Sequence, residues 1–148
     1  MRISAKGRYA LTAAVCLAQQ YADDSYVSVI SISDKIGVSK IYLEQVFSLL
    51  KRGGIVTATK GTQGGYQLAR VPEKISALDI LSAVESTLFE PAGDSGNNKA
   101  PEINKALKSL VFERLDGAVY EALGSVTLAG LVTEVARLDS EQGFMFYI

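Results

Sequence analysis

The chain has 148 residues, of which 48% are apolar and 21% charged, so it is long enough to form one compact hydrophobic core. Its single cysteine and its lack of histidine exclude an intrachain disulfide, remove most ligands of zinc, copper and iron sites, and remove the commonest general base, so we expect neither a catalytic nor a metal site. The net charge of −1 conceals an asymmetry, because residues 1–74 carry ten Lys or Arg against five Asp or Glu, whereas residues 75–148 carry five against eleven.

Three helices are predicted in the N-terminal part of the chain. Residues 6–21 combine apolar residues at helical spacing with good helix formers and contain no proline. Ser28 or Ser31 is suited to cap a short second helix that Gly37 ends. Ser39 offers an N-cap for a third helix, in which apolar residues recur at i, i+3, i+4 and i+7. The second and third helices, joined by a tight turn, form a helix-turn-helix candidate.

A β-hairpin is predicted directly after the third helix. Residues 55–59 are a β-branched run, residues 60–65 form a glycine-rich tip, and residues 66–69 form a second strand. A hairpin in this position is typical of the wing of a winged helix-turn-helix domain. Ser76 and Asp79 resemble a capping box, which predicts the start of a fourth helix. The expected fold is therefore mainly α with a small β-wing.

The rest of the chain is predicted to contain elements outside the winged helix-turn-helix domain, which we place at residues 1–85. Residues 86–101 include many Gly, Asn, Asp and Ser residues and are expected to form a flexible linker. Residues 102–138 are expected to hold a long amphipathic dimerisation helix and a shorter helix ending at Leu138, followed by an apolar tail at residues 139–148. The residues expected to contact a second copy are Leu107, Leu110, Val111 and Leu115.

The exposed face of the third helix is predicted to enter the major groove of double-stranded DNA. Gln45 can pair with an adenine edge, Glu44 can accept a hydrogen bond from a cytosine amine, and Tyr42 can reach a phosphate or a thymine methyl group. Ser39 and Lys40, near the start of the helix, suit phosphate oxygens. An ordinary solvated helix face is the alternative interpretation.

The wing and the start of the first helix supply further basic and flexible residues. Lys60, with Gly64 and Gly65, would let a positive charge and backbone amides approach a phosphate or a narrow minor groove. Additional phosphate contacts are expected from three basic residues, Arg2, Lys6 and Arg8. A plain hairpin loop and a solvated basic terminus are the alternatives. The net charge of +5 over residues 1–74 favours DNA binding over a pure protein-interaction module.

Two further expectations concern the cysteine and the location of the protein. Cys16 lies mid-helix among apolar residues, where a buried, inert thiol is expected and a redox sensor is the alternative. No apolar run approaches the roughly 18 to 20 residues that cross a bilayer, and the first residues lack an apolar signal core. We therefore expect a cytoplasmic protein with no membrane partner.

The sequence resembles the Rrf2 family of regulators in several stretches. These are residues 1–10 (MRISAKGRYA), 42–45 (YLEQ) and 64–70 (GGYQLAR), and the similarity continues through residues 78–80 and 127–129 to nearly the whole chain. The resemblance implies a winged-helix domain, a long dimerisation helix and repression at an inverted repeat. It also implies that the third helix, through its Tyr, Glu and Gln, and the wing lie at the DNA.

Many members of this family hold an iron–sulfur cluster with three cysteines in the loop before the dimerisation helix. Residues 92–100 contain no cysteine, so we expect no cluster and no cofactor. The terminal residues 145–148 (MFYI) resemble those of cluster-free family members that repress cysteine metabolism, which implies a cysteine synthase as partner. Tyr147 and Ile148 would then dock in the substrate pocket of the synthase. Burial of the tail within the dimer is the alternative.

Two other functions stay open on the sequence alone. The chain could regulate another pathway by binding a small molecule between the winged domain and the dimerisation helix. It could also be a winged-helix module that binds protein, because this fold does not require a DNA ligand.

Overall fold

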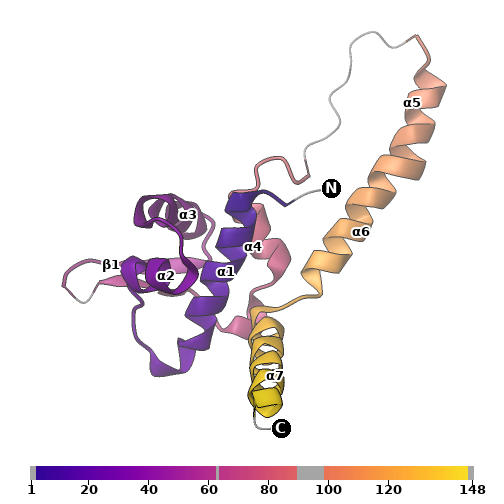
Figure 1. The fold of residues 1–148 in the computed structure, drawn as a ribbon. Helices are drawn as coiled ribbons and strands as arrows, with labels where there is room; N and C mark the ends of the chain where they lie inside the picture. Colours follow the sequence, from indigo (N-terminus) through magenta and orange to yellow (C-terminus); the bar gives the residue numbers. More distant parts are fainter. Residues whose placement is uncertain (1–2, 63, 90–98, 147–148) are drawn as a thin grey trace.

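The computed structural model describes residues 3–62, 64–89 and 99–146 of the chain. A helical body carries a small two-stranded sheet on one side, and a long helix projects from its other side (Figure 1). The fold is mainly α with a β-wing, as predicted. The elements of the body are α1 (Ala5–Gln19), η1 (Tyr21–Asp23), α2 (Val29–Ile36), α3 (Lys40–Arg52), β1 (Val56–Thr59), β2 (Gly65–Leu68), η2 (Pro72–Lys74) and α4 (Ala77–Val84). The elements that follow are α5 (Pro101–Leu107), η3 (Lys108–Phe112), α6 (Glu113–Gly124) and α7 (Leu128–Phe146).

Serine side chains cap the four α-helices of the body, α1 to α4. The hydroxyl of Ser28, rather than Ser31, caps α2, and Ser39 caps α3 by accepting a hydrogen bond from the backbone N–H of Tyr42 at 3.2 Å. At α4 the predicted capping box is confirmed, because Ser76 and Asp79 each accept a hydrogen bond from the backbone N–H of the other.

The hydrophobic core lies between α1, α3 and α4. The predicted inward face of α3 is confirmed, since its four apolar residues at i, i+3, i+4 and i+7 are all buried. The ring of Phe47 stacks on Tyr66 of β2 at a centroid distance of 4.4 Å, so the wing and α3 share the core. This packing fixes α3 with its opposite face at the surface.

The wing is an antiparallel hairpin in which Val56 pairs with Leu68 and Thr59 with Gly65. The strands start one residue away from their predicted positions. Tyr66 also forms two backbone hydrogen bonds with Val27, at 2.8 and 2.9 Å, so the segment before α2 extends the sheet by one bridge. These bonds anchor the base of the wing to the body.

The predicted long helix is present from Pro101 to Gly124 as α5, η3 and α6, and η3 is a π-helical segment that the sequence did not predict. It projects from the body along most of its length (Figure 1). At its C-terminal end, Gly124 approaches the side chain of Leu78. Tyr120 meets the ring of Phe89 at a centroid distance of 6.1 Å.

Helix α7 packs on the core of the body rather than ending as a short helix with a separate tail. Leu128 is completely buried in the core, and Leu131 and Val132 pack against it. The helix runs to Phe146, so the predicted end at Leu138 is wrong. The ion pairs of Arg137 with Glu134 and Glu141 on successive turns favour helix across that point. The division into domains stays a prediction.

Candidate nucleic-acid interface

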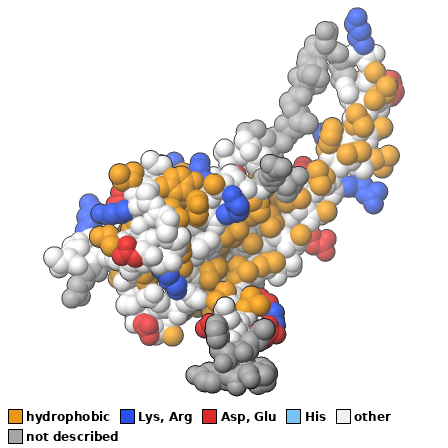
Figure 2. All heavy atoms as spheres, in the orientation of Figure 1, with side chains coloured by type: hydrophobic (Ala, Val, Ile, Leu, Met, Phe, Trp, Pro, Cys, Tyr) orange, Lys and Arg blue, Asp and Glu red, His pale blue; other side chains and the backbone are white. Residues whose placement is uncertain are grey.

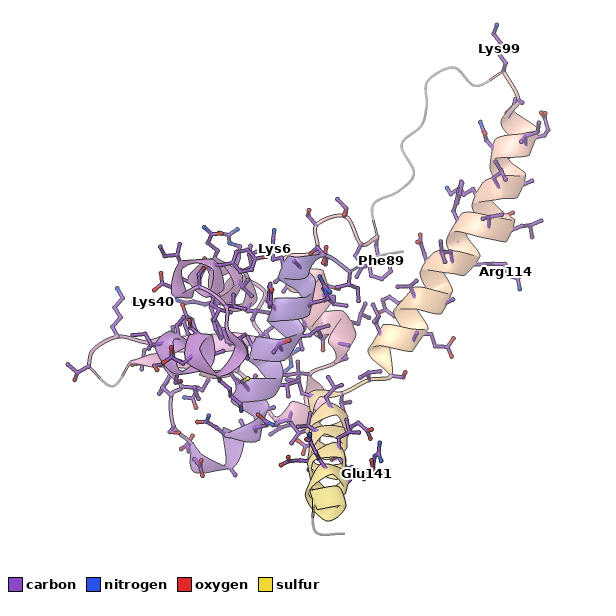
Figure 3. All side chains as sticks on the ribbon, viewed as in Figure 1. Lys6, Lys40, Phe89, Lys99, Arg114 and Glu141 are labelled. Carbon is purple, nitrogen blue, oxygen red and sulfur yellow. The ribbon has the colours of Figure 1, made fainter. Side chains whose placement is uncertain are left out.

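The exposed face of α3 and the N-terminal end of α1 line an open groove. Lys6 of α1 stands beside α3 on this side of the molecule (Figure 3). The groove is lined by Lys6, Ile41, Tyr42, Glu44, Gln45, Val46, Ser48 and Leu49. It therefore brings together several of the residues that the sequence places at DNA.

The polar side chains of α3 lie at the surface, as the helical periodicity predicted. Gln45 is exposed and keeps its amide available for a base edge. Glu44 forms an ion pair with Lys40 at 3.7 Å, and both side chains are about half exposed. An exposed i, i+4 pair contributes little to stability, so either partner can exchange it for a contact to DNA at small cost.

Tyr42 and Ser39 have structural roles beside those predicted from the sequence. Tyr42 is half-buried against the core, and its ring meets Tyr9 edge-on at a centroid distance of 5.6 Å. This contact fixes the direction of the ring. The oxygen of Ser39 accepts the capping hydrogen bond of α3, which leaves its hydroxyl proton free to donate to a phosphate.

The start of α1 is held in place by a residue at the end of α4. The carboxylate of Glu85 accepts hydrogen bonds from the backbone N–H of Ser4, at 3.0 Å, and from its hydroxyl. This contact positions Lys6 and Arg8, which are both exposed. Of the two, only Lys6 lines the groove. Arg2 lies outside the described residues.

The glycines of the wing have packing reasons that the sequence did not reveal. A side chain on Gly65 would place its Cβ 2.2 Å from the backbone oxygen of Val27, so this position requires the close approach that only glycine allows. A Cβ added at Gly64 would likewise lie too close to the backbone oxygen of Thr59, at 2.7 Å. Lys60 is exposed in the connection between the strands. Contact of these residues with DNA stays a prediction.

Arg70 was not identified from the sequence, although it follows the wing within a recognised motif. Its guanidinium donates hydrogen bonds to the backbone oxygens of Gly54 and Lys74, both at 3.1 Å, and to Asp79 at 3.3 Å. These bonds join the end of α3, the base of the wing and the start of α4. Arg70 thus holds α3, the wing and α4 in fixed positions relative to one another. The capping box at Asp79 was the available signal, but only the fold brings Arg70 to it.

The residues predicted to form the dimer contact, Leu107, Leu110, Val111 and Leu115, are all exposed on the projecting helix. Leu110 is 65% exposed. Figure 2 shows apolar side chains along this helix and onward over the adjoining part of the body. An apolar surface of this extent on one side of a projecting helix is typical of a protein contact.

Cys16 is buried, as predicted, and burial raises the pKa of its thiol. Within residues 3–62, 64–89 and 99–146, no three His, Cys, Asp or Glu side chains come together as a metal site would require. No helix in the same ranges is long and apolar enough to cross a membrane. Tyr147 and Ile148 lie outside the described residues.

Comparisons with known proteins agree with this geometry. The Rrf2 family, described as an iron-dependent transcriptional regulator, matches residues 3–134. The HTH-type transcriptional regulator CymR of Bacillus subtilis is 36% identical over 149 residues, covering 100% of this chain and 100% of that protein. The regulator IscR of Cereibacter sphaeroides is 37% identical over 141 residues, covering 93% of this chain and 90% of that protein.

Solved structures give the same result. The structure of CymR (YrzC), the global cysteine regulator of B. subtilis, matches with a TM-score of 0.74 and 34% identity, over 90% of this chain and 98% of that chain. The structure of T. potens IscR also has a TM-score of 0.74, with 33% identity over 99% of this chain and 97% of that chain. These relatives are transcriptional regulators rather than enzymes. The chain therefore belongs to the Rrf2 family of DNA-binding transcriptional regulators, whose winged-helix fold it shares.

Proposed function

We propose that this regulator is a homodimeric, cytoplasmic repressor that places α3 of each protomer in the major groove of an inverted repeat. The observation that carries the proposal is the division of α3 into two faces. Its apolar face is buried in the core, while Glu44 and Gln45 are exposed in a groove flanked by Lys6. An amide and a carboxylate can distinguish base edges, and the lysine can neutralise a phosphate.

The dimer is supported by the apolar surface of the projecting helix. Five apolar residues between 107 and 115, the four predicted contact residues and Phe112, are exposed there and are not covered by any other part of the described chain. A second copy offers the same surface, so a two-fold contact would cover both at once. The two α3 helices would then meet two half-sites related by the same symmetry.

The donor atoms of this chain do not fit an iron–sulfur cluster, although the family is described as iron-dependent. The sequence has one cysteine and no histidine, and Cys16 is buried within α1 with a raised pKa. A cluster needs several thiolates at one place, so the residues present cannot hold it. We infer that this repressor acts without a cluster.

Control of cysteine metabolism is the pathway we favour. CymR of B. subtilis matches over the full chain and is named a global cysteine regulator in its solved structure. A cysteine synthase that captures Tyr147 and Ile148 would report sulfur supply. Direct binding of a small molecule and a role as a protein-interaction module are the competing functions. The exposed amide and cation in the α3 groove favour DNA over the second of these.

The proposal is tested by selecting DNA fragments from a random duplex library with the full-length protein. We expect enrichment of an inverted repeat. Gln45→Ala should relax the preference at one base pair per half-site by about 1 to 3 kcal/mol and leave affinity for unrelated DNA nearly unchanged. Lys6→Ala is the matched control, since it should weaken binding to all sequences alike. Equal losses on every sequence for Gln45→Ala would exclude α3 as the reading element.

A further inference from the structure

One apolar side chain of α3 is exposed at the surface, whereas Tyr42 and Leu49 are half-buried. Ile41 is 72% exposed, the highest exposure of any large apolar residue in the described ranges. It lines the groove together with Gln45, Ser48 and Lys6. Isolated exposed apolar residues are common and need no function, so its position within the groove is what distinguishes Ile41.

The residues before and after Ile41 in the chain both make contacts within the protein. Lys40 pairs with Glu44 on one side, and Tyr42 packs against Tyr9 and the core on the other. Ile41 lies between them in the first turn of α3, directly after the capping Ser39. In helix-turn-helix proteins the first residues of the recognition helix are the ones that reach base edges.

We propose that Ile41 determines specificity by contacting the 5-methyl group of a thymine in the major groove. This methyl group is the one apolar feature that the four base pairs present in that groove, and apolar side chains are suited to it. A β-branched side chain in a helix has one strongly preferred rotamer, so the contact surface of Ile41 is preset. The inference rests on the proposed position of α3 in the major groove.

The spacing of Ile41 and Gln45 predicts where the thymine lies. Residues four apart on a helix have Cβ atoms about 5 to 6 Å apart, and base pairs follow each other every ~3.4 Å. The thymine contacted by Ile41 should therefore lie within about two base pairs of the adenine that pairs with Gln45. The selected half-site should contain both bases.

The test uses the selected DNA and replaces its thymines one at a time with uracil, which lacks only the 5-methyl group. For the wild-type protein we expect one position per half-site at which uracil lowers affinity about three- to fivefold. Ile41→Ala should lose this sensitivity and bind both duplexes equally, whereas Ile41→Val should keep part of it. Both variants change an exposed side chain, so the fold should be retained.

Ile30→Ala is the matched control, because Ile30 is also an exposed isoleucine, at 55%, but does not line the groove. It should retain the full sensitivity to uracil. Tolerance of uracil at every position by the wild-type protein, or persistence of the sensitivity in Ile41→Ala, would overturn the proposal. If Gln45→Ala still relaxes the preference, the position of α3 in the groove stands and the assignment of Ile41 alone fails. If neither Gln45→Ala nor Ile41→Ala changes the sequence preference, both the position of α3 in the major groove and the assignment of Ile41 fail.

Discussion

The guanidinium of Arg70, at the end of the wing, donates a hydrogen bond to the carboxylate of Asp79 in the first turn of α4 across 3.3 Å. The same carboxylate oxygen accepts the backbone N–H of Ser76 in the capping box, and Arg70 also binds the backbone oxygen of Gly54. One arginine thus joins the end of α3, the end of the wing and the start of α4.

Replacing Arg70 by Ala should lower the free energy of unfolding by roughly 1 to 2 kcal/mol, because three hydrogen bonds are lost at a partly exposed site. In a double-mutant cycle, the coupling free energy between Arg70→Ala and Asp79→Ala should be less than about 1 kcal/mol, since solvent screens the ion pair. Urea unfolding measures both values. Arg137→Ala is the control, because Arg137 pairs with two acidic side chains but only on the surface of α7, within one helix. An equally large loss in that variant would contradict the role given to Arg70.

Binding to the selected DNA should weaken steeply with salt, because lysines at phosphates release condensed counterions. Lys60→Ala and Lys6→Ala should each reduce the slope of log affinity against log salt by about 0.9. The measurement is a salt titration by fluorescence anisotropy. Lys105→Ala, which removes the same charge from α5, should leave the slope unchanged. If Lys105→Ala also reduced the slope, the salt dependence would reflect the total charge of the protein rather than contacts of Lys6 and Lys60 with phosphates.

Leu110→Asp should convert a dimer to a monomer, because it places a charge in the centre of the exposed apolar surface of the projecting helix. Sedimentation velocity at micromolar concentration checks this, and the monomer should bind the inverted repeat poorly. Ser109→Asp adds the same charge at an adjacent, polar position and should stay dimeric. A wild-type monomer at this concentration would contradict the dimer itself.

Deleting Tyr147 and Ile148 should leave folding and dimerisation intact and abolish association with a cysteine synthase, because these two residues would form the docking segment. Calorimetry with full-length and shortened proteins measures this. Equal affinity of the two proteins would exclude docking through the tail. Absence of binding by both would also remove the assignment to cysteine metabolism.

Cys16 should react slowly with iodoacetamide in the folded protein at neutral pH, because burial both blocks access and raises the pKa of the thiol, which keeps it protonated. Labelling should become fast in urea. The raised pKa also predicts the direction of a pH effect. The unfolded thiol ionises first as pH rises through its ordinary pKa, so stability should fall at alkaline pH and Cys16→Ala should reduce that loss. Rapid labelling of the folded protein would instead support the redox-sensor alternative.

Local signals in the sequence predicted much of the local structure. Serine caps at positions 28, 39 and 76 act within one helical turn, so short-range patterns identify them. The end predicted for the last helix, at Leu138, is wrong, because α7 continues to Phe146. The ion pairs of Arg137 with Glu134 and Glu141 on successive turns favour a helix that continues across that point.

The order of the elements, the buried face of α3 and the shortage of metal-binding side chains could all be predicted from the amino-acid sequence, because periodicity, capping and composition are local properties or counts. The contacts between residues far apart in the chain could not be predicted in this way. Arg70 reaches Asp79, Glu85 holds Ser4 across 81 positions, and Gly65 lies against Val27. Such contacts arise from the packing of α1, α3, α4 and the wing around one core. No pattern in the sequence specifies them, because they depend on how separate elements are oriented in space.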